Sequence, residues 1–381
     1  MKKILSFTDY YWPGYKAGGT IRAFMNQVEY LKHDFEFFIV TRNTDYTEET
    51  PYGEIGADQW VSISERVHVY YVSAPATRIS LFNRLIRERD YDLVYIHLLF
   101  GFWYSFLPLL LAKFHHCREI IIAPHGVLGA GALGLKPMKK NLFLSFARIT
   151  GLYNGTVFHS VTPHETEDIR KHIGKKTTIA EARELPRKAS DPPKRNRKTA
   201  GCLNMVTVAR IAPEKNQLFA LEILGNISDH EIRYDLIGPV YDEVYWTRCQ
   251  ALIGELPPNI RVTYRGSINS ELIPSELQSY DIMILTTTGE NFGHTILESF
   301  MAGTPVIISD RTPWRDLERS GTGRDIPLSD RNGFREAIGF FASLGDAEFE
   351  KYSAKAFTFA RNYITNPEML AENINLFNRH V

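Results

Sequence analysis

The stretch TTTGENFGHTILESFMAGTPVIISD (residues 286–310) decides the fold class. An apolar strand over 281–287 leads into a glycine-flanked loop. A helix then begins near Gly293, ends at 301–303 and is followed by a second apolar strand over 306–309. A helix that joins two short apolar strands is typical of a parallel sheet, so the stretch predicts an α/β protein.

The same alternation of strands and helices occurs on both sides of this stretch. In the first half we predict strands over 3–8, 35–41, 93–97 and 120–123, and helices over 20–31 and after 97. In the second half we predict strands over 204–208, 233–237 and 260–264, helices over 217–224 and 273–279, and terminal helices over 333–343, 348–363 and 367–378. Two series in a chain of 381 residues predict two tandem Rossmann-like domains facing a central cleft.

A change of composition near Pro186 predicts the boundary between the domains. The segment PRKASDPPKRNRKT is basic and proline-rich and has no apolar period, which favours a linker over 186–200. The N-terminal domain is then 1–185 and the C-terminal domain 201–363, and we expect the helix over 364–381 to rejoin the first domain. Ligands of open parallel sheets bind beyond the carboxyl ends of the strands, so we expect the ligand between the two sheets.

The charge and the cysteine content exclude several classes of protein. Basic and acidic side chains balance at 44 each, and the basic linker lacks interleaved aromatic residues, so we expect no nucleic-acid partner. The cysteines, Cys117, Cys202 and Cys249, are too few and too widely spaced for a disulfide framework or a zinc site. A reducing compartment fits this composition, so we predict a cytoplasmic protein.

The apolar stretch LLFGFWYSFLPLLLAKF (98–114) is too short to span a bilayer and contains Pro108. It is either a buried helix or a surface that contacts lipid or a lipid-linked substrate. The second alternative predicts peripheral membrane contact through 98–112, at the inner face of the membrane. The apolar run at the N-terminus is too short for a secretory signal, and we interpret it as the first strand.

The loop and helix of 286–310 carry groups suited to a sugar and a phosphate. Gly289 and Gly293 allow the backbone to approach a ligand closely, and the amides at the helix start suit an anion. Glu290 can accept hydrogen bonds from sugar hydroxyls, and Glu298 from a ribose diol; alternatively, Glu290 is only a charge at the helix start and Glu298 an ordinary exposed helix residue. The predicted donor-binding residues here are Asn291, Phe292, Gly293, His294, Thr295 and Glu298.

These residues resemble the retaining glycosyltransferases of the GT-B type, in particular family 4. That family carries two glutamates with seven residues between them, here Glu290 and Glu298, followed by a segment like MAGTPVIISD. The resemblance extends to VARIAPEKNQ (208–217), where the family places an Arg and a Lys five apart, here Arg210 and Lys215. In the family both cations reach the diphosphate of the donor, whose negative charge grows as it leaves.

The resemblance also covers the first domain, more loosely. The loop ending in Gly18 and Gly19 is similar to the family's glycine-rich loop, which borders the phosphates and the acceptor. His125, in IIIAPHGVLG, matches a family histidine that lies near the reacting sugar; by itself it could be a structural residue. Residues 266–268 frame the base by the same analogy, while 178–189 lack the Asn-Gly that family members often carry there.

The resemblance implies a hexosyltransferase that uses a nucleotide-diphosphate sugar, with a saccharide or a lipid-linked saccharide as acceptor, in surface polysaccharide or glycoconjugate synthesis. The implied catalytic residues are His125, Arg210, Lys215 and Glu290. We expect no cofactor and no metal, because Asp90-Tyr91-Asp92 is interpreted as a turn and 115–117 have no partner cluster. Alternatives are a nucleotide-sugar epimerase or phosphorylase on the same fold, or a non-catalytic nucleotide-sugar-binding protein. Trp314 and Arg315 either border the site or are structural.

Overall fold

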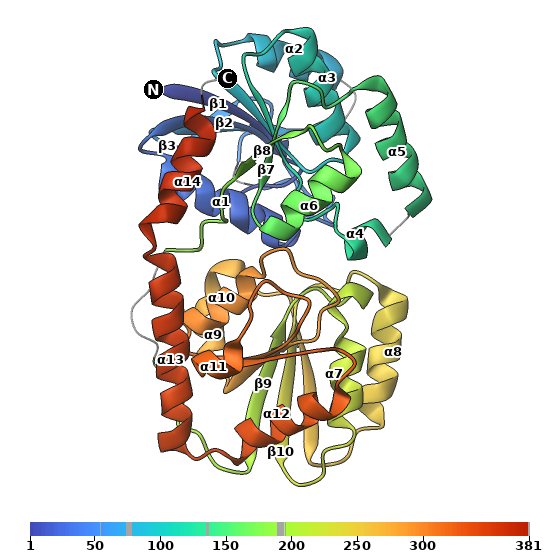
Figure 1. Cartoon of the computed structure of the whole chain (residues 1–381), viewed down its shortest axis with the longest axis vertical. Helices are drawn as coiled ribbons and strands as arrows, with labels where there is room; N and C mark the ends of the chain where they lie inside the picture. The colour runs from blue at the N-terminus through green and yellow to red at the C-terminus, as the bar shows by residue number, and fades with distance from the viewer. Residues whose placement is uncertain (54, 74–77, 135–136, 189–193, 195, 380–381) are drawn as a thin grey trace. The chain divides into compact units, whose positions relative to one another are not determined.

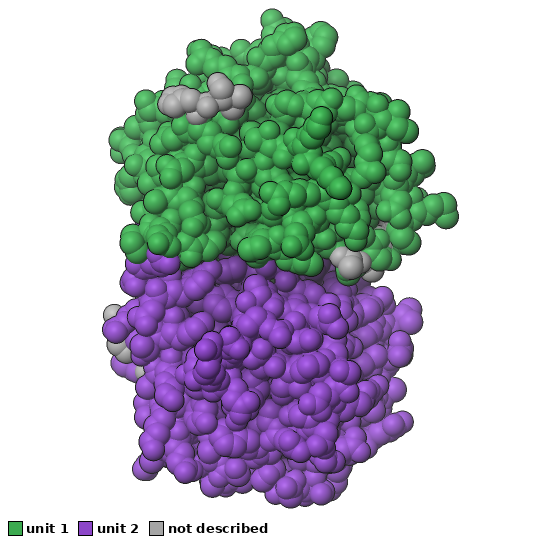
Figure 2. Space-filling model, in the orientation of Figure 1, with its two compact units in different colours: residues 1–185, 367–381 green, residues 186–366 purple. Residues whose placement is uncertain are grey.

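The computed structural model describes residues 1–53, 55–73, 78–134, 137–188, 194 and 196–379. The chain divides into two compact units (Figure 2). Unit 1 contains Met1–Leu185 and Pro367–Val381, and unit 2 contains Pro186–Asn366. Part of the predicted linker, residues 189–193 and 195, lies outside the described residues.

Unit 1 is built on a sheet whose strands are almost all parallel. In spatial order the strands are β3 (Trp60–Ser64), β4 (Val67–Val72), β2 (Phe35–Arg42), β1 (Lys2–Phe7), β5 (Leu93–His97), β6 (Ile120–Ala123), β7 (Val157–Ser160) and β8 (Thr178–Glu181). The edge strand β3 pairs antiparallel with β4, and the other pairs are parallel. The strand order reverses between β1 and β5, which places a topological switch point there.

Helices cover both faces of this sheet, so each face has its own apolar core. One face carries α1 (Gly19–Leu31) and α14 (Pro367–Asn378). The other carries α2 (Arg78–Arg87), η2 (Phe102–Phe106), α3 (Leu107–Phe114), α5 (Pro137–Thr150) and α6 (Pro163–His172), and α4 (Ala130–Gly134) precedes α5. The arrangement explains why the central strands β5, β6 and β7 are buried at every residue, as expected for a parallel sheet covered on both sides.

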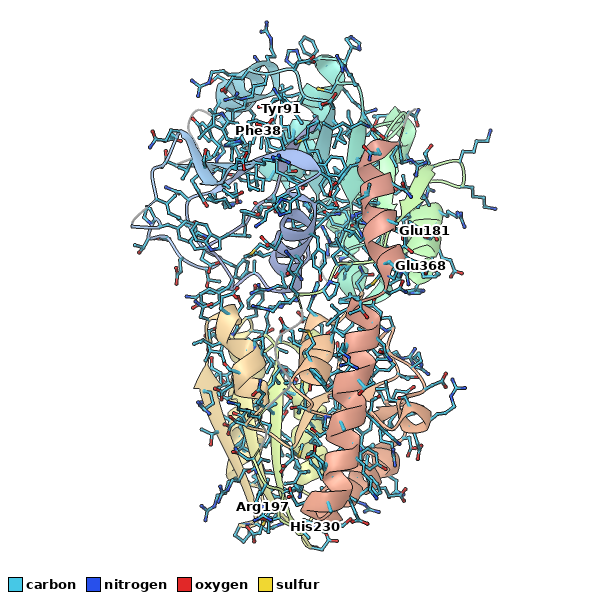
Figure 3. All side chains as sticks on the ribbon, turned by 90° about the vertical axis from the view of Figure 1, so that its left-hand side faces the viewer. Phe38, Tyr91, Glu181, Arg197, His230 and Glu368 are labelled. Carbon is cyan, nitrogen blue, oxygen red and sulfur yellow. The ribbon has the colours of Figure 1, made fainter. Side chains whose placement is uncertain are left out.

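The last helix, α14, returns to unit 1 and is held there by charge as well as by apolar contact. Arg183, just after β8, forms ion pairs with Glu368 at 3.2 Å and Glu372 at 2.5 Å. Figure 3 shows Glu368 beside Glu181, the last residue of β8, on one side of unit 1. Phe377 near the end of α14 is fully buried against Phe35 and Tyr95 of the sheet.

Unit 2 is built on a fully parallel sheet (Figure 1). Its strands lie in the order β11 (Ile260–Gly266), β10 (Glu231–Ile237), β9 (Cys202–Val208), β12 (Ile282–Leu285), β13 (Val306–Ser309) and β14 (Gly323–Ile326). In chain order this is 3-2-1-4-5-6, the arrangement of dinucleotide-binding Rossmann domains, with the switch point between β9 and β12.

The unit 2 sheet is also covered on both faces. The core of one face involves α7 (Gln217–Leu224), α8 (Glu243–Gly254) and α12 (Arg331–Ser343). The core of the other involves α9 (Ile273–Leu277), α10 (His294–Met301), α11 (Leu317–Ser320) and α13 (Asp346–Ile364). Two single turns, η3 (Pro213–Lys215) and η4 (Ser270–Leu272), precede α7 and α9.

The apolar stretch 98–114 forms the π-helical turn η2 and the helix α3. Most of it packs into the core of unit 1 through residues such as Tyr104, Leu107 and Leu109, while Phe102 and Leu110 are exposed. No described helix is long and apolar enough to cross a membrane. Membrane contact through 98–112 stays a prediction.

Candidate functional site

Two loops of unit 2 meet at the switch point between β9 and β12. The threonines that follow β12 bind them together. Thr286 donates through its hydroxyl to the carbonyl of Asn216 at 2.8 Å, and Thr287 to the carbonyl of Glu214 at 3.0 Å. The amide of Thr288 donates to the same Glu214 carbonyl at 2.9 Å. The run of threonines in the sequence therefore joins the 209–216 loop to the loop that carries Glu290.

At this junction Lys215 and Glu290 form an ion pair, and both side chains are only 14% exposed. Lys215 ends the turn η3, and the amide of Glu290 donates to the carbonyl of Arg311 at 2.9 Å. The structure thus brings together two predicted site residues that are distant in sequence. A pair this well shielded from solvent holds both charged groups in defined positions.

Arg210 adds a second cation to the same edge. Its guanidinium lies 3.4 Å from the Glu214 carboxylate and 4.5 Å above the ring of Tyr241. The side-chain amide of Gln217 donates to the Arg210 carbonyl at 2.7 Å, which fixes the backbone of the loop. A guanidinium stacked on a ring and one third exposed remains available to an anionic ligand.

Two glycines allow the close backbone approaches that this edge requires. Gly238 follows β10 with φ 145°, and a Cβ atom there would lie 2.0 Å from the carbonyl oxygen of Ala209. Gly293 has φ 81°, and its Cβ would lie 2.8 Å from Ile296. Gly238 escaped the sequence analysis, since only the fold brings β10 next to the loop after β9.

The loop before α10 is anchored by buried aromatic residues. The Phe292 side chain is buried against Trp314, whose indole donates to the Phe292 carbonyl at 2.6 Å. Phe292 therefore offers a ligand its main chain rather than its ring, and Trp314 is a structural residue here. Helix α10 begins at His294, where the first amides have no intrahelical acceptor and the dipole is positive.

Glu298 is not an exposed helix residue: it is 7% exposed, and its carboxylate lies 3.5 Å from the guanidinium of Arg187. Arg187 also pairs with Glu271 at 2.5 Å and donates to the carbonyl of Ser270 at 2.9 Å. The alternative of an ordinary exposed glutamate is therefore wrong. Arg187 was missed because it lies in the basic segment 186–200, which reads as a solvated linker.

In unit 1, Gly18 and Gly19 mark the start of α1 at the loop after β1. Gly18 has φ 88°, the left-handed region that favours glycine, and Gly19 is the first helical residue. Asp45 holds the preceding loop, because its carboxylate accepts from the amides of Tyr15 at 3.0 Å and Lys16 at 3.3 Å. These glycines lie at the carboxyl end of the sheet of unit 1, next to its switch point.

His125 follows β6 and also has a left-handed backbone, with φ 54°. A non-glycine residue in this conformation is strained and is favoured at functional positions. The turn is held by Glu165, whose carboxylate accepts from the Gly126 amide at 2.6 Å and the Val161 amide at 2.9 Å. Burial of this carboxyl raises its pKa despite those two hydrogen bonds.

The His125 imidazole lies in a buried row of polar side chains. Its Nε2 is 2.9 Å from Nδ1 of His97, the rings are stacked, and its Nδ1 is 3.9 Å from the Glu184 carboxylate. Burial, together with the nearby charges of His125 and His159, lowers the pKa of His97 well below its ordinary value, so His97 stays neutral. His97 and Glu184 therefore fix the orientation of His125, a role that the linear sequence does not reveal.

Other candidate residues have structural partners. Asp90 and Asp92 form ion pairs with Arg118 at 3.2 and 3.4 Å. Within the described ranges, no group of three or more His, Cys, Asp or Glu side chains could hold a metal ion. Arg315 pairs with Asp325 at 3.3 Å, and the Gly266 carbonyl accepts from the Gly238 amide at 2.9 Å.

The comparisons with known proteins agree with this geometry. Residues 193–340 match the family model described as "Glycosyl transferases group 1", and this range lies within unit 2. The matched range includes Arg210, Lys215, Glu290 and Glu298. No curated protein matches the chain at the level of sequence.

Several solved structures share the fold over almost the whole chain. A glycosyltransferase from Rickettsia africae has a TM-score of 0.71 at 16% identity and covers 99% of this chain and 97% of its own. Anabaena Alr3699/HepE, in complex with UDP and glucose, has a TM-score of 0.69 at 14% identity and covers 99% and 98%. WaaG, a glycosyltransferase involved in lipopolysaccharide biosynthesis, has a TM-score of 0.64 at 14% identity and covers 99% and 100%. The predicted α/β fold with two Rossmann-like sheets, as in GT-B proteins, is confirmed.

Proposed function

We propose that this chain is a retaining GT-B glycosyltransferase of family 4 that transfers a hexosyl group from a nucleotide-diphosphate sugar to an acceptor. The observation that carries the proposal is the shielded Lys215–Glu290 ion pair beside Arg210, at the switch point of a sheet that matches the glycosyltransferase family. Two fixed cations and a carboxylate at a switch point are the groups that a sugar diphosphate requires.

Each residue has a distinct role in this proposal. Arg210 and Lys215 bind the diphosphate and offset the negative charge that grows as it leaves, so no metal ion and no other cofactor is required. Glu298 binds the ribose. Glu290 and the amides of 291–295 bind the donor sugar and the diphosphate, where the α10 dipole favours negative charge.

His125 positions the reacting sugar or the acceptor in this scheme, and Gly18 and Gly19 border the phosphates. The stacked His97 ring and the Glu184 carboxylate keep the imidazole in one orientation. We assign no protein nucleophile.

For the donor and acceptor we propose a nucleotide sugar and a saccharide or lipid-linked saccharide, used in the cytoplasm for surface polysaccharide or glycoconjugate synthesis. The structural neighbours support this choice, since the HepE structure is a complex with UDP and glucose and WaaG is involved in lipopolysaccharide biosynthesis. Their sequence identities of 14% leave the choice of sugar to experiment.

A thermal-shift panel of UDP, GDP, ADP and their common sugars, without added metal, tests the proposal first. A ligand at about 100 times its dissociation constant stabilises the folded state by about 2.7 kcal/mol, which raises the melting temperature measurably. We expect one diphosphate to act, and its effect to be lost in Lys215→Ala and Glu298→Ala but kept in Lys351→Ala, which changes an exposed lysine of α13. No shift with any nucleotide would contradict the proposal.

Incubation with the selected nucleotide sugar, followed by mass spectrometry, separates the alternatives. A transferase releases the nucleoside diphosphate and adds a hexose mass to an acceptor. An epimerase changes the sugar while it stays attached to the nucleotide, and a phosphorylase requires inorganic phosphate. Binding with no product of any kind would favour a non-catalytic nucleotide-sugar-binding protein.

A further inference from the structure

Helix α5 of unit 1 has apolar residues on two opposite faces. Leu144 and Ala147 are buried in the core of the unit, as expected for a surface helix. A second apolar stripe points to solvent and consists of Met138, Leu142, Phe146 and Ile149, with exposed fractions of 83%, 72%, 49% and 86%. Their spacing of four, four and three residues places them on one side of the helix. We call this set the α5 stripe.

Nothing in the described part of the chain covers the α5 stripe. Figure 1 shows α5 on the outside of unit 1, at the right edge of the view. Its inner side contacts Phe100 and Phe106 through the ring of Phe143, and Phe106 in turn contacts the exposed Phe102. A contiguous exposed apolar surface of this kind is typical of an interaction site.

The charged residues of α5 have one sign. The sequence from 120 to 164 contains no Asp or Glu, and the charged residues of α5 are Lys139, Lys140 and Arg148. The end of α6 and the turn after it read RKHIGKK (170–176) and add further basic residues without an acidic one. Arg148 joins the two segments, since its guanidinium donates to the carbonyls of 171 and 172 at 3.2 and 3.0 Å.

A cavity of about 340 Å³ lies between these two segments. Its walls include Arg148, His172 and Lys176 together with the glycine turns at 151, 155 and 174, and no acidic residue. Burial and the positive charge of Lys171 lower the pKa of His172, against the opposing effect of the Asp168 carboxylate. A small basic cavity beside an apolar stripe has the chemistry to accept a phosphate headgroup while acyl chains meet the stripe.

We propose that the α5 stripe and the basic segment 170–176 form a docking surface for an anionic phospholipid bilayer. Helix α5 has 14 residues and is about 21 Å long, too short to span a bilayer, so it lies in the plane of the interface with the stripe among the acyl chains. The basic residues then face the anionic headgroups.

Charge favours a lipid surface over a second copy of the chain. A symmetric dimer through the α5 stripe would place the same basic patch against itself, which costs free energy. The predicted contact through 98–112 contributes only Phe102 at the edge of this surface, because most of that stretch is buried.

Co-sedimentation of the full chain with vesicles tests the docking surface. We expect at least about tenfold more protein to sediment with vesicles that contain phosphatidylglycerol than with pure phosphatidylcholine. Salt at about 1 M, where the Debye length is about 3 Å, should remove most of that difference. Equal sedimentation with both vesicles, or none with either, would overturn the proposal.

Two pairs of variants locate the surface. Leu142→Ser with Ile149→Ser should lower sedimentation at least about tenfold, whereas Ile79→Ser with Val244→Ser, exposed aliphatic residues elsewhere, should not. Lys175→Ser with Lys176→Ser should weaken binding to anionic vesicles, and Lys351→Ser with Lys355→Ser, both exposed on α13, should leave it unchanged.

Retained binding by the α5 variant would overturn the proposal. So would a concentration-dependent dimer in sedimentation velocity that this variant abolishes, combined with no vesicle binding, since that result assigns the stripe to a second copy. Circular dichroism at matched temperature verifies that each variant is folded. Vesicle binding requires no nucleotide sugar, so this proposal stands or falls independently of the proposed transferase activity.

Discussion

The carboxyl edges of the two sheets carry different chemistry. In unit 2 the edge is ionic: Arg210, Lys215 and Glu290 are held by ion pairs and remain partly open to solvent. In unit 1 the edge carries His125, a stacked imidazole in a buried row with His97. The ionic edge suits direct binding of a diphosphate, whereas the buried edge suits exact placement of one group.

The comparison predicts that the ionic edge has the largest effect on turnover. Lys215→Ala and Glu290→Ala each break the ion pair and remove a group that the proposed function places against the leaving diphosphate or the sugar. We expect turnover to fall by about 10²–10³ with the folded state retained. The measurement is the initial rate of nucleoside diphosphate release.

The matched controls are Lys351→Ala and Glu348→Ala, which change exposed residues of α13 in the same unit. They should keep a rate within about twofold of the parent, since exposed surface positions rarely matter. Near-parental turnover in both folded site variants would contradict the assignment of the ionic edge.

The groups of the ionic edge were singled out through the resemblance to family 4, whose motifs lie in short segments of the sequence. The glycine-flanked loop, the apolar strands and the cations of 208–217 all occur close to strand ends, and the helices over 217–224 and 367–378 were predicted with the bounds that the structure has. Local patterns cannot reveal a contact between distant segments, so the Lys215–Glu290 pair and the role of Gly238 became visible only in the fold.

The unit 1 edge could be anticipated only in part. His125 was singled out, but its partners His97 and Glu184 are far away in sequence and carry no local signal. Strands β3, β4, β7 and β8 were also missed: β3 is only partly buried, and β7 and β8 have four residues each, so their apolar runs are short, while β4 is well buried but its apolar run contains a histidine. The exposed stripe of α5 resembles a core-facing pattern in the sequence, and only burial distinguishes the two.

The second prediction concerns the buried edge. His125→Asn removes the imidazole, while Asn tolerates the left-handed backbone that this position requires. We expect turnover to fall by about 10², within the usual range for loss of one positioned side chain. The donor-induced thermal shift should persist, because the ionic edge is intact.

The control for the second prediction is His33→Asn, an exposed position of unit 1. A loss of donor binding in His125→Asn equal to the loss in Lys215→Ala would remove the distinction between the two edges.

The third prediction is that the free energy of unfolding depends on pH through the buried histidines of unit 1. Burial lowers the pKa of His159 to about 4, whereas an unfolded histidine has a pKa near 6.5. The unfolded state therefore binds more protons below about pH 6.5, and stability falls as the pH falls toward 4. At pH 5 the loss from His159 is about 2 kcal/mol, or about 30-fold in the unfolding equilibrium.

The measurement is the melting temperature at pH 7.5 and pH 5. His159→Gln can keep the hydrogen bonds to Tyr95 and to the Ala182 carbonyl, and it should show a smaller drop between the two pH values than the parent. His33→Gln should show the same drop as the parent. A drop in His159→Gln as large as the parent's would mean that other groups govern the acid sensitivity.

The fourth and smallest effect tests whether Glu298 belongs to the ionic edge or only to the packing of α10. Its carboxylate lies 3.5 Å from Arg187, which has two further partners, so Glu298→Gln should leave the fold intact. A ribose diol bound by a carboxylate loses one charge-assisted interaction in this variant. We therefore expect the donor dissociation constant to rise about tenfold, equivalent to about 1.4 kcal/mol.

Isothermal titration with the nucleoside diphosphate and with the diphosphate lacking the nucleoside separates the roles of Glu298. Only the nucleoside diphosphate should bind more weakly. Equal weakening of both would place Glu298 with the phosphates, and no change in either would leave it as a structural partner of Arg187, which would confine the ionic edge to Arg210, Lys215 and Glu290.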